Sequence, residues 1–228
     1  MFNSRRAGRL DLYQKASNGT GAETLLFSDM QNNLYPTGWS RDGRYIVYFS
    51  GNATARTGND LWLLPMPPAP DVRRGAARRG MPFVQTPFNE TIAAISADGR
   101  WAAYMSGESG RNEIYVTSFP GASGKWQISS GGGAFPRWRR DGKELYFVSQ
   151  NARMMAAEVN GQANGFSVGT VKTLFDSQMR TTGFAGTNPP NYDVSADGQK
   201  FLVNIAEESG ASVPTTLMVN WTEELRKN

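Results

Sequence analysis

The chain has 228 residues, 39% of them hydrophobic and 19% charged, which is enough for one folded all-β domain with a sizeable core. It contains no cysteine and no histidine, so disulfides, thiolate chemistry, His-ligated zinc and the Ser-His-Asp triad are excluded. The net charge of +4 is too small by itself to indicate nucleic-acid binding.

The two ends of the chain are predicted to be tails. Residues 1–8 are polar, include Arg5 and Arg6, and lack the apolar region of a signal peptide, so we expect a disordered segment there. Residues 223–228 form a short polar C-terminal tail, and residues 9–222 are predicted to be a single domain. No stretch approaches the roughly 18 apolar residues of a membrane span.

Short strands follow one another from residue 10 onward, with no convincing amphipathic helix between them. Each is a run of apolar residues, alternating with polar ones or continuous, and bounded by Gly, Pro, Asn, Asp or Ser. Residues 65–81, rich in proline and arginine, are predicted to be a long outer loop. The expected strands are residues 10–15, 24–27, 35–40, 45–49, 60–64, 82–86, 91–96, 101–105, 113–117, 125–128, 135–139, 145–148, 154–158, 171–175, 192–195, 201–204 and 215–221.

One hairpin turn recurs four times. Each copy has an apolar residue, two further residues, an Asp-Gly pair, a polar or basic residue and then an apolar run. Asp-Gly between apolar runs indicates a hairpin, because glycine tolerates positive φ and aspartate bonds its own backbone. The aspartates are Asp42, Asp98, Asp141 and Asp197, which lie 56, 43 and 56 residues apart.

This spacing predicts an all-β fold, a β-propeller of four-stranded antiparallel blades. A blade takes roughly 40–45 residues, and the longer spacings leave room for loops. The strands suggest about four to five blades, with incomplete sets at both ends of the chain. Either the two ends join and close the ring, or open blade edges pair with a second copy to form a homodimer. The apolar residue three before each aspartate is expected to pack between blades.

An ordered set of motifs runs through the chain, at residues 38–44 (Gly-Trp-Ser-Arg-Asp-Gly-Arg), 59–65 (Asn-Asp-Leu-Trp-Leu-Leu-Pro), 83–90, 124–133, 192–198 and 219–221. This set resembles the TolB-like, WD-like β-propeller that follows a transmembrane segment in many bacterial serine/threonine protein kinases. The resemblance covers the chain from about residue 10 and corresponds to the C-terminal part of that propeller. The Ser-Pro-Asp-Gly usual in this family has lost its proline in all four copies.

The resemblance implies a sensor or interaction propeller without its kinase, because the kinase signatures are absent from this chain. In that family the domain is extracytoplasmic. The family leaves the ligand unspecified, so the function has to be argued from a site.

The predicted site lies where the first strand of each blade begins, on the face opposite the Asp-Gly turns. Nine residues before the four aspartates stand Asn33, Asn89, Gly132 and Asn188. Oxygen ligands without His or Cys suit a hard cation such as Ca²⁺. Other polar residues expected on this face are Glu90, Asn191, Asp193, Asp29, Asp176, Asn52, Glu108, Arg111, Glu207 and Glu208.

Simpler explanations compete with each of these functional assignments. Asn and Asp before a strand commonly cap turns through side-chain-to-backbone bonds. The arginines at positions 73, 74, 78 and 79 are interpreted as a solvated loop, because no aromatic residues are interleaved for base stacking. Trp39, Trp101 and Trp138 are interpreted as packing residues rather than a sugar platform.

Two functions remain open. The first is a binding module whose channel face recognises a small molecule or protein. The alternative is a Ca²⁺-dependent hydrolase of esters, lactones or phosphotriesters. In that case Asn33, Asn89, Asn188 and Glu90 would be metal ligands, and Asp193, with Glu90, would be the catalytic residues.

Overall fold

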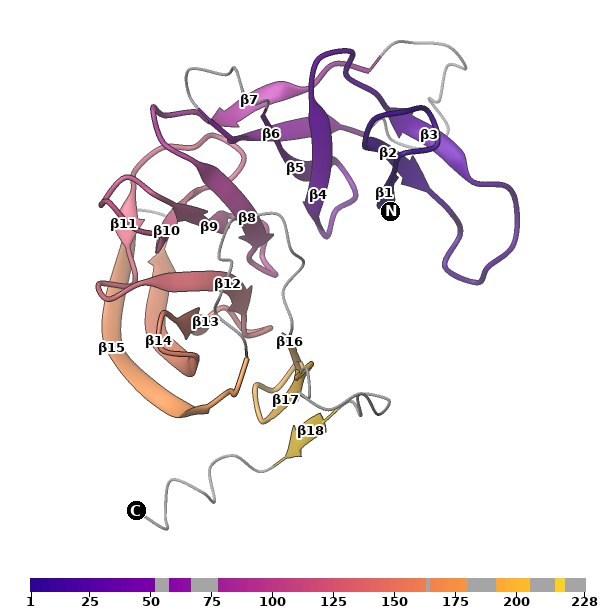
Figure 1. Cartoon of the computed structure of the whole chain (residues 1–228). Coiled ribbons are helices and arrows are strands. Elements are labelled where there is room, and N and C mark those ends of the chain that lie inside the picture. Colours follow the sequence, from indigo (N-terminus) through magenta and orange to yellow (C-terminus); the bar gives the residue numbers. More distant parts are fainter. Residues whose placement is uncertain (52–57, 67–77, 163–164, 180–191, 206–215, 220–228) are drawn as a thin grey trace. The chain divides into compact units, whose positions relative to one another are not determined.

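The computed structural model describes residues 1–51, 58–66, 78–162, 165–179, 192–205 and, for the backbone alone, 216–219. All regular secondary structure in these residues is β-strand, and within them no helix could cross a bilayer (Figure 1). The strands are β1 (Phe2–Ser4), β2 (Asp11–Gln14), β3 (Thr24–Phe27), β4 (Asn33–Trp39), β5 (Tyr45–Gly51), β6 (Asp60–Pro65), β7 (Met81–Val84), β8 (Glu90–Ile95), β9 (Trp101–Ser106), β10 (Glu113–Ser118), β11 (Trp126–Gln127), β12 (Gly133–Trp138), β13 (Glu144–Ser149), β14 (Arg153–Gln162), β15 (Gly165–Asp176), β16 (Tyr192–Val194), β17 (Lys200–Val203) and β18 (Thr216–Val219).

These strands form five antiparallel sheets in which neighbours in the sequence are neighbours in space. We call them sheet I (β1–β3), sheet II (β4–β7), sheet III (β8–β11), sheet IV (β12–β15) and sheet V (β16–β18). Sheets II, III and IV have four strands each, as the repeat of the Asp-Gly turn predicts. The prediction of successive four-stranded antiparallel sheets is therefore confirmed.

Contacts divide the chain into two compact units, residues 1–93 and 94–228. In the first unit, leucines of sheet I meet apolar residues of sheet II to form a core of Leu12, Leu26, Leu34, Ile46, Tyr48 and Leu64. Full burial of one such side chain contributes about 1.5–3 kcal/mol, so this cluster is a main source of stability for the unit.

In the second unit, aromatic residues join sheets IV and V. The rings of Tyr146 and Phe201 meet edge to face at 5.1 Å, and Phe175 approaches Phe201 at 5.3 Å. The hydroxyl of buried Tyr192 donates a hydrogen bond of 2.7 Å to the carbonyl of Phe135. These contacts join sheets IV and V, and the bond of Tyr192 links the first strands of the two sheets.

The four Asp-Gly turns have the predicted backbone conformation. The glycines Gly43, Gly99, Gly142 and Gly198 all have φ between 70 and 74°. In the first turn the Ser40 hydroxyl donates to Asp42 Oδ1 at 2.6 Å, and the Arg44 N–H donates to the same oxygen at 3.0 Å. The second and fourth turns repeat this pattern. The aspartates therefore have the turn role expected for them.

The residue three before the aspartate is less uniform than predicted. Trp138 is half-buried and donates its indole N–H to the carbonyl of Ala94 at 2.9 Å. Trp39 is 42% exposed, and its indole N–H bonds the turn carbonyl of Gly43 at 3.2 Å. The prediction that this position packs between blades is wrong for Trp39, because its ring caps its own turn instead.

The N-terminus corrects another expectation. Residues 2–4, placed by their polar surroundings in a disordered tail, form β1 and pair with β2. Phe2 stacks on Tyr13 at 6.0 Å, and the Arg6 guanidinium lies 4.6 Å from the Tyr13 ring centre. Arg6 also forms an ion pair of 2.5 Å with Glu23. These aromatic and cationic contacts order a segment whose own sequence is weakly strand-forming.

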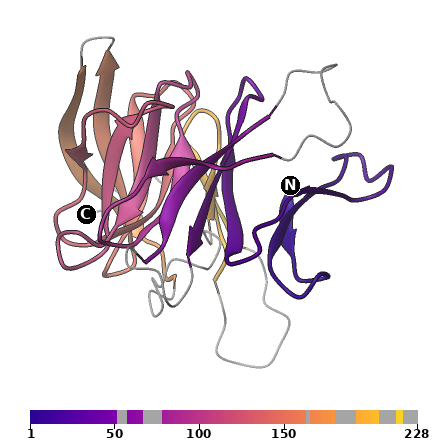
Figure 2. The same ribbon diagram turned by 90° about the horizontal axis from the view of Figure 1, so that it is seen from above.

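Strands β14 and β15 are longer than the sequence predicts, ten and twelve residues instead of five each (Figures 1 and 2). Their extra length includes the pairs Asn160↔Ser167 and Gly161↔Phe166. Phe166 lies 4.9 Å from Trp101, 5.5 Å from Trp126 and 6.2 Å from Trp138, measured between ring centres. This aromatic cluster anchors the extension.

Candidate functional site

A cavity lies on the face of the second unit opposite its turns. Three loops reach it, those between β9 and β10, between β11 and β12, and between β13 and β14. We call this surface the loop face. The cavity has a volume of about 180 Å³ and is lined by Arg111, Asn112, Gly132, Gly133 and Gln150.

A buried carboxylate holds one of these loops in place beside the cavity. Glu113, at the start of β10, is 2% exposed. The Ser129 hydroxyl donates to its Oε2, and the Gly132 N–H donates to its Oε1 at 2.8 Å. The Ser129 oxygen in turn accepts the N–H of Ile114 at 2.8 Å. A buried charge that is hydrogen-bonded in this way fixes the groups around it.

Two lining positions require glycine. A Cβ on Gly132, whose φ is 90°, would lie 2.8 Å from Gln150 Cβ. A Cβ on Gly133 would lie 2.6 Å from the Ser129 hydroxyl. The close approach of the loop to Gln150 and Ser129 therefore depends on the absence of side chains at these two positions.

Arg111 provides the positive charge at the cavity. Its side chain is exposed, and among the described residues it has no ion-pair partner. Glu108, on the same β9–β10 loop as Arg111, is engaged elsewhere, in a 2.6 Å ion pair with Lys125. The cavity thus combines one guanidinium with the amides of Asn112 and Gln150.

The predicted residues Asn33, Asn89 and Glu90 lie in the first unit, and each has a partner within the chain. Asn33 Oδ1 accepts the N–H of Leu10 at 3.0 Å. Asn89 Oδ1 accepts the backbone N–H of Asn59 at 3.0 Å. The buried Glu90 carboxylate accepts the Thr86 hydroxyl at 2.6 Å and the Thr86 N–H at 3.2 Å. The bonds of Asn33 and Asn89 join segments 23 and 30 residues apart in the sequence, whereas those of Glu90 are local. The role as metal ligands stays a prediction.

Asp193 belongs to the second unit. It is exposed on β16, where its Oδ1 accepts the N–H of Val194 at 2.9 Å. Asn188 lies outside the described residues. Within the described part of the chain, no three acidic side chains are grouped closely enough to hold a metal ion. The catalytic roles of Asp193 and Glu90 also stay predictions.

The remaining predicted residues divide into two groups. Asp29 accepts the N–H of Gln31 at 2.8 Å, and Asp176 accepts the N–H of Gln178 at 3.0 Å, so both shape local turns. Glu108 pairs with Lys125, and Arg111 lines the cavity. Asn52, Asn191, Glu207, Glu208, Arg73 and Arg74 lie outside the described residues.

The sequence pattern did not single out Asn112, Glu113, Ser129, Gly133 or Gln150. One usable signal was the acid that precedes an apolar strand in successive repeats, at Asp11, Asp60 and Glu113. A second was the run of three glycines at 131–133, in the only repeat that lacks the asparagine.

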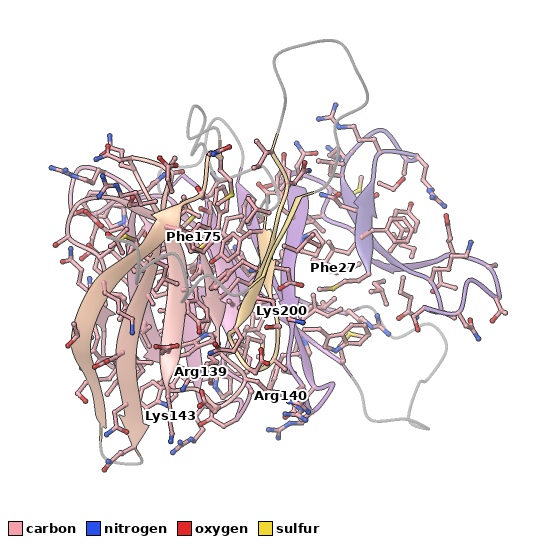
Figure 3. The ribbon with its side chains drawn as sticks, turned by 90° about the horizontal axis from the view of Figure 1, so that it is seen from below. Phe27, Arg139, Arg140, Lys143, Phe175 and Lys200 are labelled. Carbon is pink, nitrogen blue, oxygen red and sulfur yellow. The ribbon has the colours of Figure 1, made fainter. Side chains whose placement is uncertain are left out.

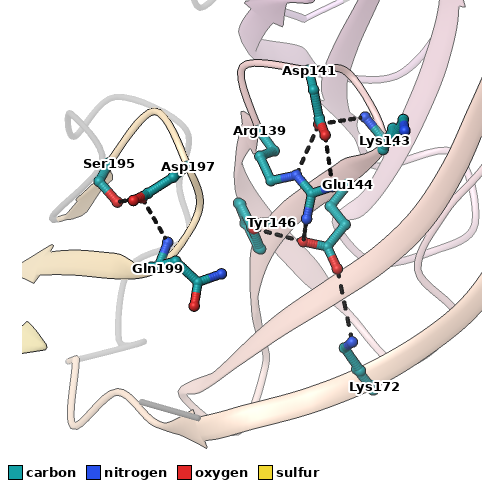
Figure 4. A network of polar contacts seen from close by, with 9 residues as sticks. All are labelled: Arg139, Asp141, Lys143, Glu144, Tyr146, Lys172, Ser195, Asp197 and Gln199. Carbon is teal, nitrogen blue, oxygen red and sulfur yellow. Dashed lines mark hydrogen bonds and ion pairs between the residues drawn. The ribbon is translucent and has the colours of Figure 1, made fainter. Parts of the chain in front are cut away.

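The turn face of the second unit carries a separate charged network (Figure 4). Arg139 replaces the serine of the other turns and binds both oxygens of Asp141, at 2.8 and 2.7 Å. It also donates to Glu144 at 2.8 Å, which accepts the Tyr146 hydroxyl at 2.7 Å and lies 3.7 Å from Lys172. The Arg139 hydrogen bonds lower the pKa of Asp141 from 3.8 to about 2. Further basic residues, Arg140, Lys143 and Lys200, belong to this turn and the adjoining one of sheet V (Figure 3).

Comparison with known proteins identifies the fold. No family model matches the sequence, and no curated protein does. Among solved structures, TolB from Acinetobacter baumannii matches with a TM-score of 0.67 and 18% identity over 96% of this chain and 48% of that one. A putative TolB from Agrobacterium tumefaciens matches with a TM-score of 0.57 and 22% identity, over 75% of this chain and 58% of that one. The periplasmic gluconolactonase PpgL of Pseudomonas aeruginosa gives a TM-score of 0.54 and 16% identity, over 92% of this chain and 63% of that one.

The chain therefore spans about half the length of the Acinetobacter TolB chain. At these identities the similarity shows the fold, a TolB-like β-propeller, as the repeated turn predicts. The relation to a kinase sensor domain stays a prediction.

Proposed function

We propose that this chain, which has the fold of a TolB-like β-propeller, is a binding module. It recognises a small molecule or one residue of a protein through the loop face of its second unit. The observation that carries the proposal is the cavity beside Arg111, where three loops meet over the rigid support of Glu113.

The size of the cavity limits what it can hold. Sites for drug-sized ligands have volumes of about 300–1,000 Å³, and a water molecule takes up about 30 Å³ of liquid. A volume of about 180 Å³ therefore accommodates one small group and not an extended ligand. Arg111 can bind a carboxylate through two parallel hydrogen bonds, while Asn112 and Gln150 can bind hydroxyl or amide groups. A small hydroxy-carboxylate fits this chemistry.

Titration with glycerate, a three-carbon hydroxy-carboxylate, followed by the amide resonances of glycines 131–133, tests the proposal. We expect these resonances to shift in the wild-type protein and the shifts to be lost in Arg111→Gln. The matched control is Arg140→Gln, which removes an exposed arginine from the turn face and should bind like the wild type. Unchanged resonances, or equal shifts in both variants, would contradict binding at the cavity.

A metal-dependent hydrolase is the second candidate, favoured by the similarity of fold to the gluconolactonase. Asn33, Asn89, Asn188 and Glu90 would hold Ca²⁺, which would polarise the scissile carbonyl or phosphoryl oxygen of an ester, lactone or phosphotriester. Asp193 would act as nucleophile or general base. The existing hydrogen bonds of Asn33, Asn89 and Glu90 within the first unit would have to be shared or replaced.

Calcium and a chelator separate the two candidates. A bound ion adds about 2.7 kcal/mol to the free energy of unfolding at a hundredfold excess over Kd. The hydrolase predicts a higher melting temperature with Ca²⁺, a lower one with chelator, and ester hydrolysis that is lost in Asp193→Asn and Glu90→Gln. A melting temperature that moves in neither direction would eliminate the metal site and leave the binding module.

A further inference from the structure

Strand β15 is the outermost strand of sheet IV and is unusually long for that position. It has twelve residues, whereas the outermost strands β3 and β7 have four each and β11 has two. Its inner edge pairs with β14, and no described strand pairs with its outer edge (Figure 1). An unpaired strand edge presents free N–H and C=O groups to another chain.

The middle of this strand is exposed to solvent on both faces. Residues 169–173, with the sequence Gly-Thr-Val-Lys-Thr, are five consecutive exposed residues, and Val171 is 40% exposed. Because side chains alternate between faces along a strand, an unbroken exposed run means that neither face is covered. Phe166 on one side and Leu174 and Phe175 on the other are buried, so the bare segment is held firmly at both ends.

Few of the usual protections of an edge are present here. Proteins block exposed edges with proline, charge, short strands or β-bulges. The register of β14 with β15 shifts opposite Gly169 and Thr170, so one such irregularity lies in this segment. Residues 169–173 contain no proline, and their single charge, Lys172, lies 3.7 Å from its own Glu144. Thr170, Val171 and Thr173 are β-branched and favour extended pairing.

We propose that residues 169–173 pair antiparallel with the same residues of a second copy, so that sheet IV continues across a two-fold axis at Val171. In this register Val171 lies opposite the partner's Val171, and Lys172 lies opposite the partner's Thr170. No like charges face each other, which makes the segment complementary to itself. This self-complementarity favours a second copy as the occupant.

The contact is short, so the dimer is weak and depends on concentration. Interfaces well below about 1,200 Å² belong to transient complexes. By sedimentation velocity we expect the 25.0 kDa monomer at low micromolar concentration and a rise toward twice that mass at several hundred micromolar. A monomer over the whole range would overturn the proposal.

Charge at the two-fold axis tests the register. Val171→Lys and Val171→Glu each place two like charges opposite each other, so either variant alone should stay monomeric. An equimolar mixture should dimerise, because Lys then faces Glu. Leu25→Lys is the matched control, since Leu25 is 54% exposed on another outermost strand and should leave dimerisation unchanged. Dimers of either variant alone, or a mixture that stays monomeric, would overturn the proposal. Circular dichroism confirms that each variant is folded.

Discussion

Glu113 shows how one buried carboxylate organises the loop face of the second unit. Taking a charge out of water costs several kcal/mol unless hydrogen bonds replace the lost hydration. Here the Ser129 hydroxyl and the Gly132 N–H supply those bonds, and the carboxylate in turn fixes the loop that lines the cavity. The hydrogen bonds that stabilise the buried Glu113 carboxylate thus also fix the shape of the cavity.

Replacing Glu113 with glutamine should lower the free energy of unfolding by about 1–3 kcal/mol, because an amide N–H would face one of the two donors. Urea unfolding measures the change. Glu108→Gln is the control, since its exposed ion pair with Lys125 contributes about 0–1 kcal/mol. An equal decrease in the free energy of unfolding in both variants would mean that the buried hydrogen bonds of Glu113 contribute no more than an exposed ion pair.

Asp141 predicts a dependence of stability on pH. Its pKa is about 2 in the folded protein and 3.8 as a free side chain, mainly because Arg139 binds its carboxylate. As pH falls, the unfolded chain takes up the proton first, so the stabilisation is complete above about pH 4 and is lost toward pH 2.

Asp141→Asn should therefore lose less stability than the wild type when urea unfolding is compared at these two pH values. The effect is modest, because the Asp141 side chain is 44% exposed and solvent screens the pair. Identical losses in the two proteins would show that Asp141 does not contribute to the acid sensitivity.

The Asp-Gly turn is an element that the sequence alone predicts well, because its hydrogen bonds join residues within six positions of each other. What the sequence does not reveal is the surroundings of each copy. A Cβ on Gly43 would face open space, whereas one on Gly198 would collide with the Tyr146 hydroxyl and lie 2.7 Å from Arg139 Cδ. Such differences depend on the packing of distant residues.

Alanine at these two glycines should distinguish the loss of stability caused by backbone conformation from the loss caused by contacts with distant residues. Gly43→Ala pays only for a left-handed conformation, about 1–2 kcal/mol. Gly198→Ala should cost clearly more, because Tyr146 and Arg139 have to move. Melting temperatures of the two variants give the comparison, and equal decreases would rule out close packing at Gly198.

The long β14–β15 hairpin was not predictable from its own residues. The segment from Asn160 to Ser167 is rich in Gly, Asn and polar residues, which are typical of loops. Residues 160–162 and 165–167 are nevertheless extended. The reason is that Phe166 contacts the rings of Trp101, Trp126 and Trp138, and that Arg100 donates to the Gly161 carbonyl at 3.0 Å. Tertiary contacts override local preference here.

Phe166→Ala should therefore cost about 3–5 kcal/mol or release the end of the hairpin. Either result exposes Trp101 and should move the tryptophan emission to longer wavelength. Val168→Ala, a smaller truncation at a half-buried site on the same strand, is the control. Unchanged emission in Phe166→Ala would show that the aromatic cluster does not depend on the hairpin.

For the whole molecule, successive sheets follow from the repeat, but the location of a site does not. Counting back from each aspartate indicates the correct end of the first strands, where Asn33 and Asn89 lie. The cavity nevertheless forms at the repeat with Gly132 in place of asparagine. The cavity depends on how three loops pack together in space. A pattern within one repeat of the sequence does not contain that information.

Burial also predicts how stability is distributed among the strands. Every residue of β9 is buried, whereas β3 has one buried residue and β11 has none. Amide hydrogens of β9 should exchange slowest, and those of β3 and β11 much faster, when hydrogen exchange is followed by mass spectrometry. Equal protection across these strands would indicate that the sheets open only as complete units.

The substitution of Arg139 for serine has a consequence for exchanging parts between repeats. The four turns share one backbone path. Serine at position 139, as at position 40, would nevertheless remove the guanidinium that binds Glu144, the carboxylate that accepts the Tyr146 hydroxyl. The copies of this turn therefore differ in their side-chain contacts. A consensus sequence averaged over them would remove Arg139, against which Gly198 of sheet V packs.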